Sequence, residues 1–172
     1  FDHLASQFFP TTVHAGEAAG LDSIRGALID GRALRLGHGV RIAEDLEVVS
    51  SEGDEVYVKF GDLARWVRDR EITLELSPSS NLQTGAIAAW GTTMEDHPFD
   101  LLYQLGFSVT VNVDNRTMSR TSLTRELALL AETFEYTLDD LEAFQLNAAA
   151  GAFLAVEERE ELIELIAEGF AR

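Results

Sequence analysis

Histidine and acidic residues occur where predicted strands end, and their side chains suit metal-assisted or acid-base chemistry. Residues 11–13 form a short β-branched run that ends at His14, and Glu17 follows three residues later. His14 offers an imidazole that can bind a metal ion, and Glu17 offers a carboxyl group that can give or take a proton. In parallel α/β sheets, active sites are built where strands end. Residues 11–17 are therefore the first candidate for a functional site.

Three further predicted strands end in polar residues that could take part in chemistry. They are a strand over residues 33–36 that ends in Gly37-His38-Gly39, one over 72–76 that ends in a polar turn at 77–81, and one over 108–113 that ends in Asp114-Asn115. The two glycines let the backbone turn sharply beside His38 and come close to whatever that histidine faces. Ser79 and Asn81 are polar side chains of the 77–81 turn. The arrangement at the first strand thus recurs three times.

Helices are predicted between and after these strands. The helical patterns cover residues 18–30, 62–70, 98–105, 123–134, 138–150 and 157–170, and residues 1–7 could be the end of a further helix. Loops are predicted at 44–55, which could hold a short hairpin near Gly53-Asp54, and at 116–122, whereas 82–94 fits no single pattern. Strand and helix alternate four times, which predicts a parallel sheet with right-handed crossovers. The four polar strand ends would then share one edge of the sheet and form one site.

The composition narrows the class of protein. A length of 172 residues predicts one domain with a core. The net charge of −17, from 30 acidic and 13 basic residues, would repel a phosphate backbone, so we expect no nucleic-acid partner. The sequence has no run of about 18 apolar residues, no signal-peptide pattern at its start and no cysteine for a disulfide or thiolate metal site. We therefore expect a cytoplasmic protein without a membrane partner.

Two imidazoles and a carboxylate at one edge suit zinc and similar divalent ions. A bound zinc ion lowers the pKa of its water to around 7 and makes that water a nucleophile. Glu17, next to such an ion, could be a general acid if its pKa is raised. The residues alone indicate metal-assisted hydrolysis on a parallel α/β scaffold. They leave the substrate open, and also the metal, since iron or cobalt would suit the same ligands.

Four motifs, together with the C-terminal segment, resemble the adenosine deaminases of the amidohydrolase superfamily. The motifs are T-V-H-A-G-E, L-G-H-G-V-R-I, S-P-S-S-N-L-Q-T-G and V-N-V-D-N, in that order and spacing. The segment from Leu138 to the last predicted helix is also similar to the C-terminus of that family. The resemblance covers nearly the whole chain. It implies an α/β fold that corresponds to strands five to eight and the C-terminal helices of a TIM-type (β/α)8 barrel, that is, its C-terminal half.

The resemblance also implies roles for individual residues. His14 would be a zinc ligand, and Asp114 would be a second ligand that also orients the metal-bound water. His38 would contact that water and stabilise the developing charge. Glu17 would hydrogen-bond the purine nitrogen N1 and donate a proton, while water attacks C6 and ammonia leaves.

Two more residues would contact the substrate by the same resemblance. They are Gly16 and Asn115, and Asn115 stands where many family members carry a second aspartate that holds the purine N7. An amide can still donate a hydrogen bond there, so we expect activity to survive with a less certain specificity. Ser77 stands in place of the commoner cysteine, which we interpret as a packing change without bearing on the chemistry.

The His-x-His motif that supplies two zinc ligands at the end of the family's first strand is absent. His3 and His97 do not form it, and His97, which precedes Pro98 at a predicted helix start, is interpreted as a cap or surface residue. A complete barrel needs about 250 residues. We therefore expect residues 1–172 to be a single partial barrel domain. A companion N-terminal half would complete it and supply two further ligands to the one zinc ion.

The resemblance implies zinc-dependent hydrolysis of adenosine and 2'-deoxyadenosine to their inosine products and ammonia, carried out together with that companion half. The isolated chain would be inactive. One alternative keeps the scaffold and changes the substrate to adenine or an N6-substituted adenine nucleotide. Another is a non-catalytic half-barrel that folds or associates without metal. The retained site residues favour a catalytic parent, because a structural remnant has no physical need for them.

Overall fold

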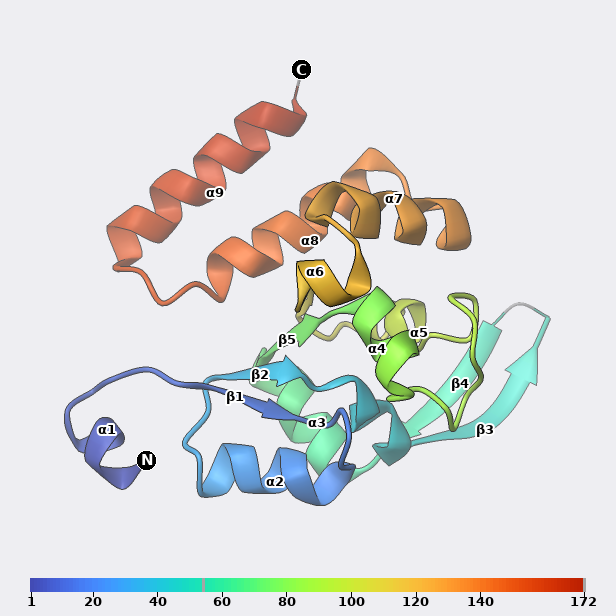
Figure 1. Cartoon of the computed structure of the whole chain (residues 1–172), viewed down its shortest axis with the longest axis horizontal. Helices are drawn as coiled ribbons and strands as arrows, with labels where there is room; N and C mark the ends of the chain where they lie inside the picture. Colours follow the sequence, from blue (N-terminus) through green and yellow to red (C-terminus); the bar gives the residue numbers. More distant parts are fainter. Residues whose placement is uncertain (54, 172) are drawn as a thin grey trace.

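A four-stranded parallel sheet organises the chain in the computed structural model, which describes residues 1–53 and 55–171. Its strands are β1 (Thr12–Ala15), β2 (Arg35–His38), β5 (Thr73–Leu76) and β6 (Val109–Val111), side by side in that order (Figure 1). Each neighbouring pair is parallel. The carboxyl ends of all four strands therefore lie at one edge, as the sequence predicts.

One face of the sheet is apolar and packs against helices. The alternate strand residues Leu36, Leu74, Leu76, Val109 and Val111 are buried in the main core. The covering helices are α2 (Leu21–Ile29), α3 (Asp62–Asp69), α5 (Phe99–Gln104), α7 (Leu123–Phe134) and α8 (Leu138–Ala150). Full burial of one such aliphatic side chain contributes about 1.5–3 kcal/mol. The period-two alternation in the strands thus separates a helix-covered face from a second face.

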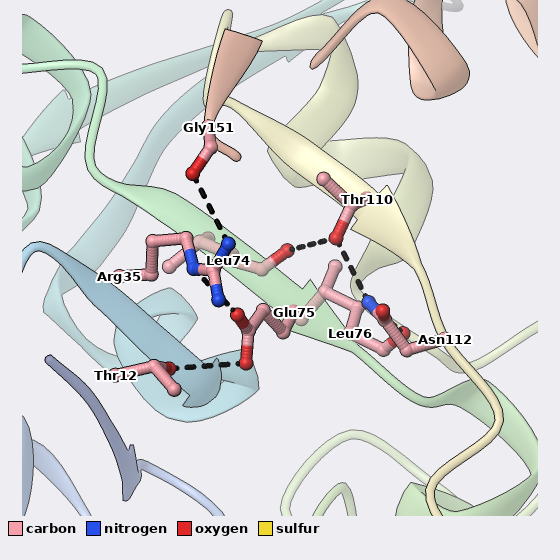
Figure 2. Close-up of polar contacts among 8 residues, drawn as sticks. All are labelled: Thr12, Arg35, Leu74, Glu75, Leu76, Thr110, Asn112 and Gly151. Atoms are coloured by element: carbon pink, nitrogen blue, oxygen red, sulfur yellow. Dashed lines mark hydrogen bonds and ion pairs between the residues drawn. The ribbon is translucent and has the colours of Figure 1, made fainter. Parts of the chain in front are cut away.

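The second face is polar, and its side chains are bonded to one another across the strands (Figure 2). The Arg35 Nε lies 2.8 Å from the Glu75 Oε1, and the Thr12 hydroxyl donates to the Glu75 Oε2 at 3.1 Å. An Arg35 Nη1–H group also donates to the Gly151 carbonyl at 3.1 Å. The Thr110 hydroxyl donates to the carbonyl of Leu74 on the neighbouring strand at 3.1 Å. Side chains from β1, β2 and β5 therefore form one network on this face.

One further helix lies at each end of the chain, the first before β1 and the second after α8. They are α1 (Asp2–Ser6) and α9 (Val156–Phe170), and α9 packs along α8 (Figure 1). At the start of α8 the Asp140 carboxylate accepts both the Thr137 N–H and the Thr137 hydroxyl at 2.8 Å and so caps the helix. Within residues 1–53 and 55–171, every helix is too short or too polar to cross a membrane.

The segment predicted as a loop over residues 44–55 is instead largely regular. A 3-10 helix, η1 (Val40–Asp45), leads into the antiparallel strands β3 (Leu46–Glu52) and β4 (Glu55–Phe60), which project from the sheet (Figure 1). In β4 the apolar residues Val56, Val58 and Phe60 alternate with polar ones, a strand pattern that the acidic composition obscures. The short hairpin is therefore confirmed but is longer than expected. Asp54, placed at its predicted turn, lies outside the described residues.

Two other predicted irregular segments contain short helices. The polar turn at 77–81 is the start of α4 (Pro78–Thr84), and the loop at 116–122 contains α6 (Arg116–Ser119). Pro78 occupies the first helical position, where its fixed φ angle favours a helix start. The Asn115 Oδ1 accepts the Met118 N–H at 3.0 Å and caps α6. Both predictions of irregular structure were wrong because capping residues were read as turn residues.

Glu126 in α7 is a buried carboxylate that joins α7 to α4. Its side chain is 1% exposed and accepts the Ser79 N–H at 3.0 Å and the Thr121 hydroxyl. We predict that Glu126→Ala lowers the free energy of unfolding by about 2–3 kcal/mol, because the part-buried Ser79 N–H and the buried Thr121 hydroxyl lose their acceptor. Urea denaturation measures this change. Glu132→Ala, at an exposed position of the same helix, is the matched control; equal effects of the two substitutions would contradict the prediction.

Candidate active site

Three residues that the sequence placed at strand ends meet at one edge of the sheet. His14 lies in β1, His38 ends β2, and Asp114 follows β6. One nitrogen of each imidazole and one carboxylate oxygen of Asp114 all lie within 4.8 Å of one another. The two imidazole rings are 5.3 Å apart between their centroids. These side chains are thus close enough to act on one bound atom or molecule.

The two glycines beside His38 give the rings their positions. A Cβ atom at Gly37 would lie 3.2 Å from the His14 ring, so the absence of a side chain lets that ring lie over β2. Gly39 has a φ angle of +72°, and a Cβ there would lie 2.7 Å from the Leu74 side chain. The sharp turn and close approach inferred from the Gly-His-Gly sequence are therefore present.

His38 and Asp114 both have left-handed backbone conformations. Their φ angles are 64° and 48°, a region that non-glycine residues seldom adopt and that costs of order 1–3 kcal/mol each. Both side chains are held by α4. The Asn81 Nδ2 lies 2.9 Å from the His38 Nδ1, and the Ser80 hydroxyl donates to the Asp114 Oδ2 at 2.6 Å. The helix that the sequence obscured therefore fixes two of the three clustered residues.

Glu17 faces the second nitrogen of the His38 ring. Its Oε2 lies 3.4 Å from the His38 Nε2, and Glu17 is partly buried. Burial lowers the pKa of His38, against the opposing effects of the Glu17 and Asp114 carboxylates. His38 is therefore neutral near pH 7. A neutral imidazole and a carboxyl group in this arrangement could share or pass on a proton.

The remaining predicted residues lie near the cluster with different contacts. Gly16 is buried, its N–H donates to the Ser23 hydroxyl at 2.9 Å, and its carbonyl accepts the Arg41 N–H. Asn115 is exposed and uses its Oδ1 to cap α6. Its Nδ2 group takes no part in that bond and keeps its ability to donate. Contact of Gly16 and Asn115 with a substrate stays a prediction.

Sequence reasoning missed two residues that support the site. Ser80 contacts Asp114 from a position 34 residues earlier, a pairing that no local pattern reveals. His97 was interpreted as a cap or surface residue: it accepts the Phe99 N–H at the start of α5 with its Nδ1 at 3.0 Å, but it is 3% exposed. The surface interpretation was wrong, because the His97 ring turns inward and its Nε2 reaches the Asn81 Oδ1. Its position before proline was the only signal in the sequence.

An open pocket of about 300 Å³ lies beside the cluster. It is lined by His14, Gly37, His38, Glu75, Ser77, Asn112, Val113 and Asp114. Ser77 is buried in this lining, and its interpretation as a packing change stays a prediction. The pocket extends from the carboxyl ends of the strands to the polar face of the sheet.

The chemistry of the donor set fits a divalent metal ion. Imidazole nitrogens and a carboxylate oxygen are ligands that zinc accepts at about 2 Å. The separations within 4.8 Å allow one ion between them. Because the His38 Nδ1 is already bonded to Asn81, only its Nε2 faces this position. Among the described residues, the His14 ring nitrogens have no hydrogen-bond partner, and Asp114 keeps one carboxylate oxygen that Ser80 does not use. These two residues are therefore the better candidate ligands.

Comparison with known proteins gives a consistent result. The family model described as Adenosine deaminase matches residues 1–169. An adenosine deaminase from Mycobacterium marinum is 49% identical over 172 residues, which cover 99% of this chain and 45% of that protein. The chain thus spans about half the length of the curated relatives it matches.

Solved structures show the same fold. A crystal structure of an adenine deaminase from Arthrobacter aurescens matches 99% of this chain and 46% of its own, with a TM-score of 0.84 and 20% identity. A Burkholderia ambifaria amidohydrolase with bound Zn matches 97% of this chain and 44% of its own, with a TM-score of 0.73 and 20% identity. These matches confirm the predicted α/β half-barrel. With the family model matching nearly every residue, the chain belongs to the adenosine deaminase family.

Proposed function

We propose that this chain carries half of the active site of a hydrolytic deaminase that converts adenosine and 2'-deoxyadenosine to inosine products and ammonia. The observation that carries the proposal is the meeting of His14, His38 and Asp114 beside Glu17. An adenosine deaminase family member has a chemical use for this set, whereas a structural half-barrel has no need of it. Relatives named Adenosine deaminase, among them the one from Mycobacterium marinum, support the choice of substrate.

The residues of this chain would divide the work by their chemistry. His14 and Asp114 would hold one divalent ion, for which zinc is the best candidate, and a second pair of ligands would come from outside this chain. When bound, such an ion makes water a usable nucleophile near neutral pH. Glu17 would protonate the purine ring at N1. His38 would direct its Nε2 at the oxygen that adds to the ring, and Asn115 would donate to N7.

The polar face of the sheet supports a companion half. The Arg35 and Glu75 side chains, although ion-paired, remain 23% and 25% exposed, and Thr12 is exposed as well. In the described residues β1 and β6 each have one neighbouring strand, so each leaves an edge of backbone groups to be paired. A companion with four parallel strands would pair both edges and cover this face.

We expect the isolated native protein to contain that companion sequence and one divalent ion. Native mass spectrometry measures both. In a steady-state assay, adenosine and 2'-deoxyadenosine should exceed adenine and N6-methyl-AMP in kcat/KM by at least roughly tenfold. A site that hydrogen-bonds the sugar rejects adenine, which lacks it, and the acidic residues Glu17, Glu75 and Asp114 would repel the phosphate of the nucleotide. Faster turnover of adenine or the nucleotide would assign the scaffold to that substrate. A metal-free particle without turnover of any of them would contradict the proposal.

Asp114→Ala should remove metal binding from the assembled protein, since the ion loses an anionic ligand. Titration with zinc, followed calorimetrically, should show at least about a tenfold loss of affinity, and turnover of adenosine should be lost with it. Asp22→Ala changes the same residue type at an exposed position of α2 and serves as the matched control. Unchanged zinc affinity in Asp114→Ala would remove this residue from the ligand set.

Glu17→Gln should keep the metal and lose most of the catalysis. The amide is nearly isosteric with the carboxyl group but cannot deliver a proton, and general acid catalysis contributes roughly 10²–10⁴-fold. We therefore expect kcat for adenosine to fall within that range, while the zinc content measured by mass spectrometry stays at the wild-type level. A near-normal kcat would exclude Glu17 as the proton donor.

A further inference from the structure

A buried series of hydrogen bonds connects the backbone at the start of α5 to His38. The Phe99 N–H donates to the His97 Nδ1 at 3.0 Å. The His97 Nε2 lies 3.3 Å from the Asn81 Oδ1, and the Asn81 Nδ2 lies 2.9 Å from the His38 Nδ1. The Phe99 and Asn81 residues are 0% exposed, and both histidines are 3% exposed. Water therefore does not compete for these contacts.

The first bond sets the direction of all the others. A backbone N–H can only donate, so the His97 Nδ1 must accept. Burial lowers the pKa of His97 to about 4, so the ring is neutral at pH 7 and has its single proton on Nε2. That N–H donates to an oxygen, which turns the Asn81 oxygen toward His97 and the Asn81 NH₂ group toward His38. An amide NH₂ group can only donate, so the His38 Nδ1 accepts.

We propose that Asn81 and His97 are positioning residues that hold His38 as the neutral tautomer with its proton on Nε2. This tautomer directs an N–H group at the Glu17 Oε2, 3.4 Å away, and into the pocket shared with Asp114. The geometry supports the assignment at each step, because every contact in the series has one donor and one acceptor. The assignment concerns the His38 ring itself and holds whether or not the protein deaminates adenosine.

The tautomer limits what His38 can do. With Nδ1 accepting from Asn81 and Nε2 carrying the proton, the ring has no lone pair left for a metal ion or for removing a proton from water. His38 is instead a hydrogen-bond donor. This consequence deepens the proposed function and rests on it, since it makes His38 a donor to the oxygen that adds to the purine ring. It also leaves His14 and Asp114 as the metal ligands of this chain.

The ring nitrogens of His38 give the direct test. Histidine labelled with ¹⁵N is incorporated into the assembled, zinc-loaded protein, and the His38 signals are identified by their loss in His38→Gln. Protonated and unprotonated ring nitrogens resonate far apart, so we expect an unprotonated Nδ1 and a protonated Nε2 in the wild-type protein. His3, which is exposed on α1, should show averaged tautomers and is the internal reference. A proton on the His38 Nδ1, or tautomers averaged as in His3, would overturn the proposal.

Variants separate a positioning role from a packing role. Asn81→Asp keeps the shape of the side chain but can only accept, so the His38 Nδ1 signal should shift to the protonated position. His97→Phe removes the donor that orients the Asn81 amide and should give mixed His38 tautomers. His97→Gln offers an N–H donor again and should restore the wild-type pattern. The same spectrum in wild type and His97→Phe would overturn the role of His97. Each backbone amide spectrum shows whether that variant is folded, and the wild-type measurement decides the tautomer without any variant.

Discussion

The site depends on two neighbouring hydrogen bonds made by one short helix. Ser80 and Asn81, adjacent in α4, bond to Asp114 and to His38 respectively. Those two partners have left-handed backbones, each of which costs of order 1–3 kcal/mol. Parallel strand pairing brings the ends of the strands to one edge, but it does not by itself orient side chains that follow those ends. The bonds from α4 supply that orientation and offset part of the strain.

Glu126 of α7 in turn holds α4 in its position. A charged group so deeply buried is tolerated only when its oxygens are well bonded, and here they accept a backbone N–H of α4 and a threonine hydroxyl. The negative charge also lies at the N-terminal end of α4, where backbone N–H groups are unpaired. A residue of the C-terminal helices thus positions the cluster indirectly, through α4. The helices after the last strand are therefore part of the support of the site and cannot be treated as an appendage.

The sequence predicted the residues at the carboxyl ends of the strands better than it predicted the helix and the contacts around them. The strands and the Gly-His-Gly turn are visible locally, because β-branched runs and flanking glycines specify backbone conformation over a few residues. The α4 helix was predicted as a turn because serine and asparagine favour both turns and helix starts. The contacts of Ser80 with Asp114 and of Asn81 with His38 span 34 and 43 residues, so no local pattern encodes them. Strand patterns and flanking glycines were therefore enough to predict the cluster, but not the contacts from α4 that hold it in place.

The polar face beneath the cluster bears on the charges within it. Glu75 lines the same pocket as His38, and its negative charge acts to raise the pKa of that histidine. Glu75 is paired with Arg35 at 2.8 Å, and the Thr12 hydroxyl and the Gly151 carbonyl make further hydrogen bonds to the two ions. An ion pair that enters a barrel interior costs several kcal/mol per ion unless such bonds are already made. The Thr12 and Gly151 bonds are in place before any companion covers this face, which lowers the cost of burying the pair. Burial of the His38 ring itself, and not this pair, lowers the pKa of that histidine.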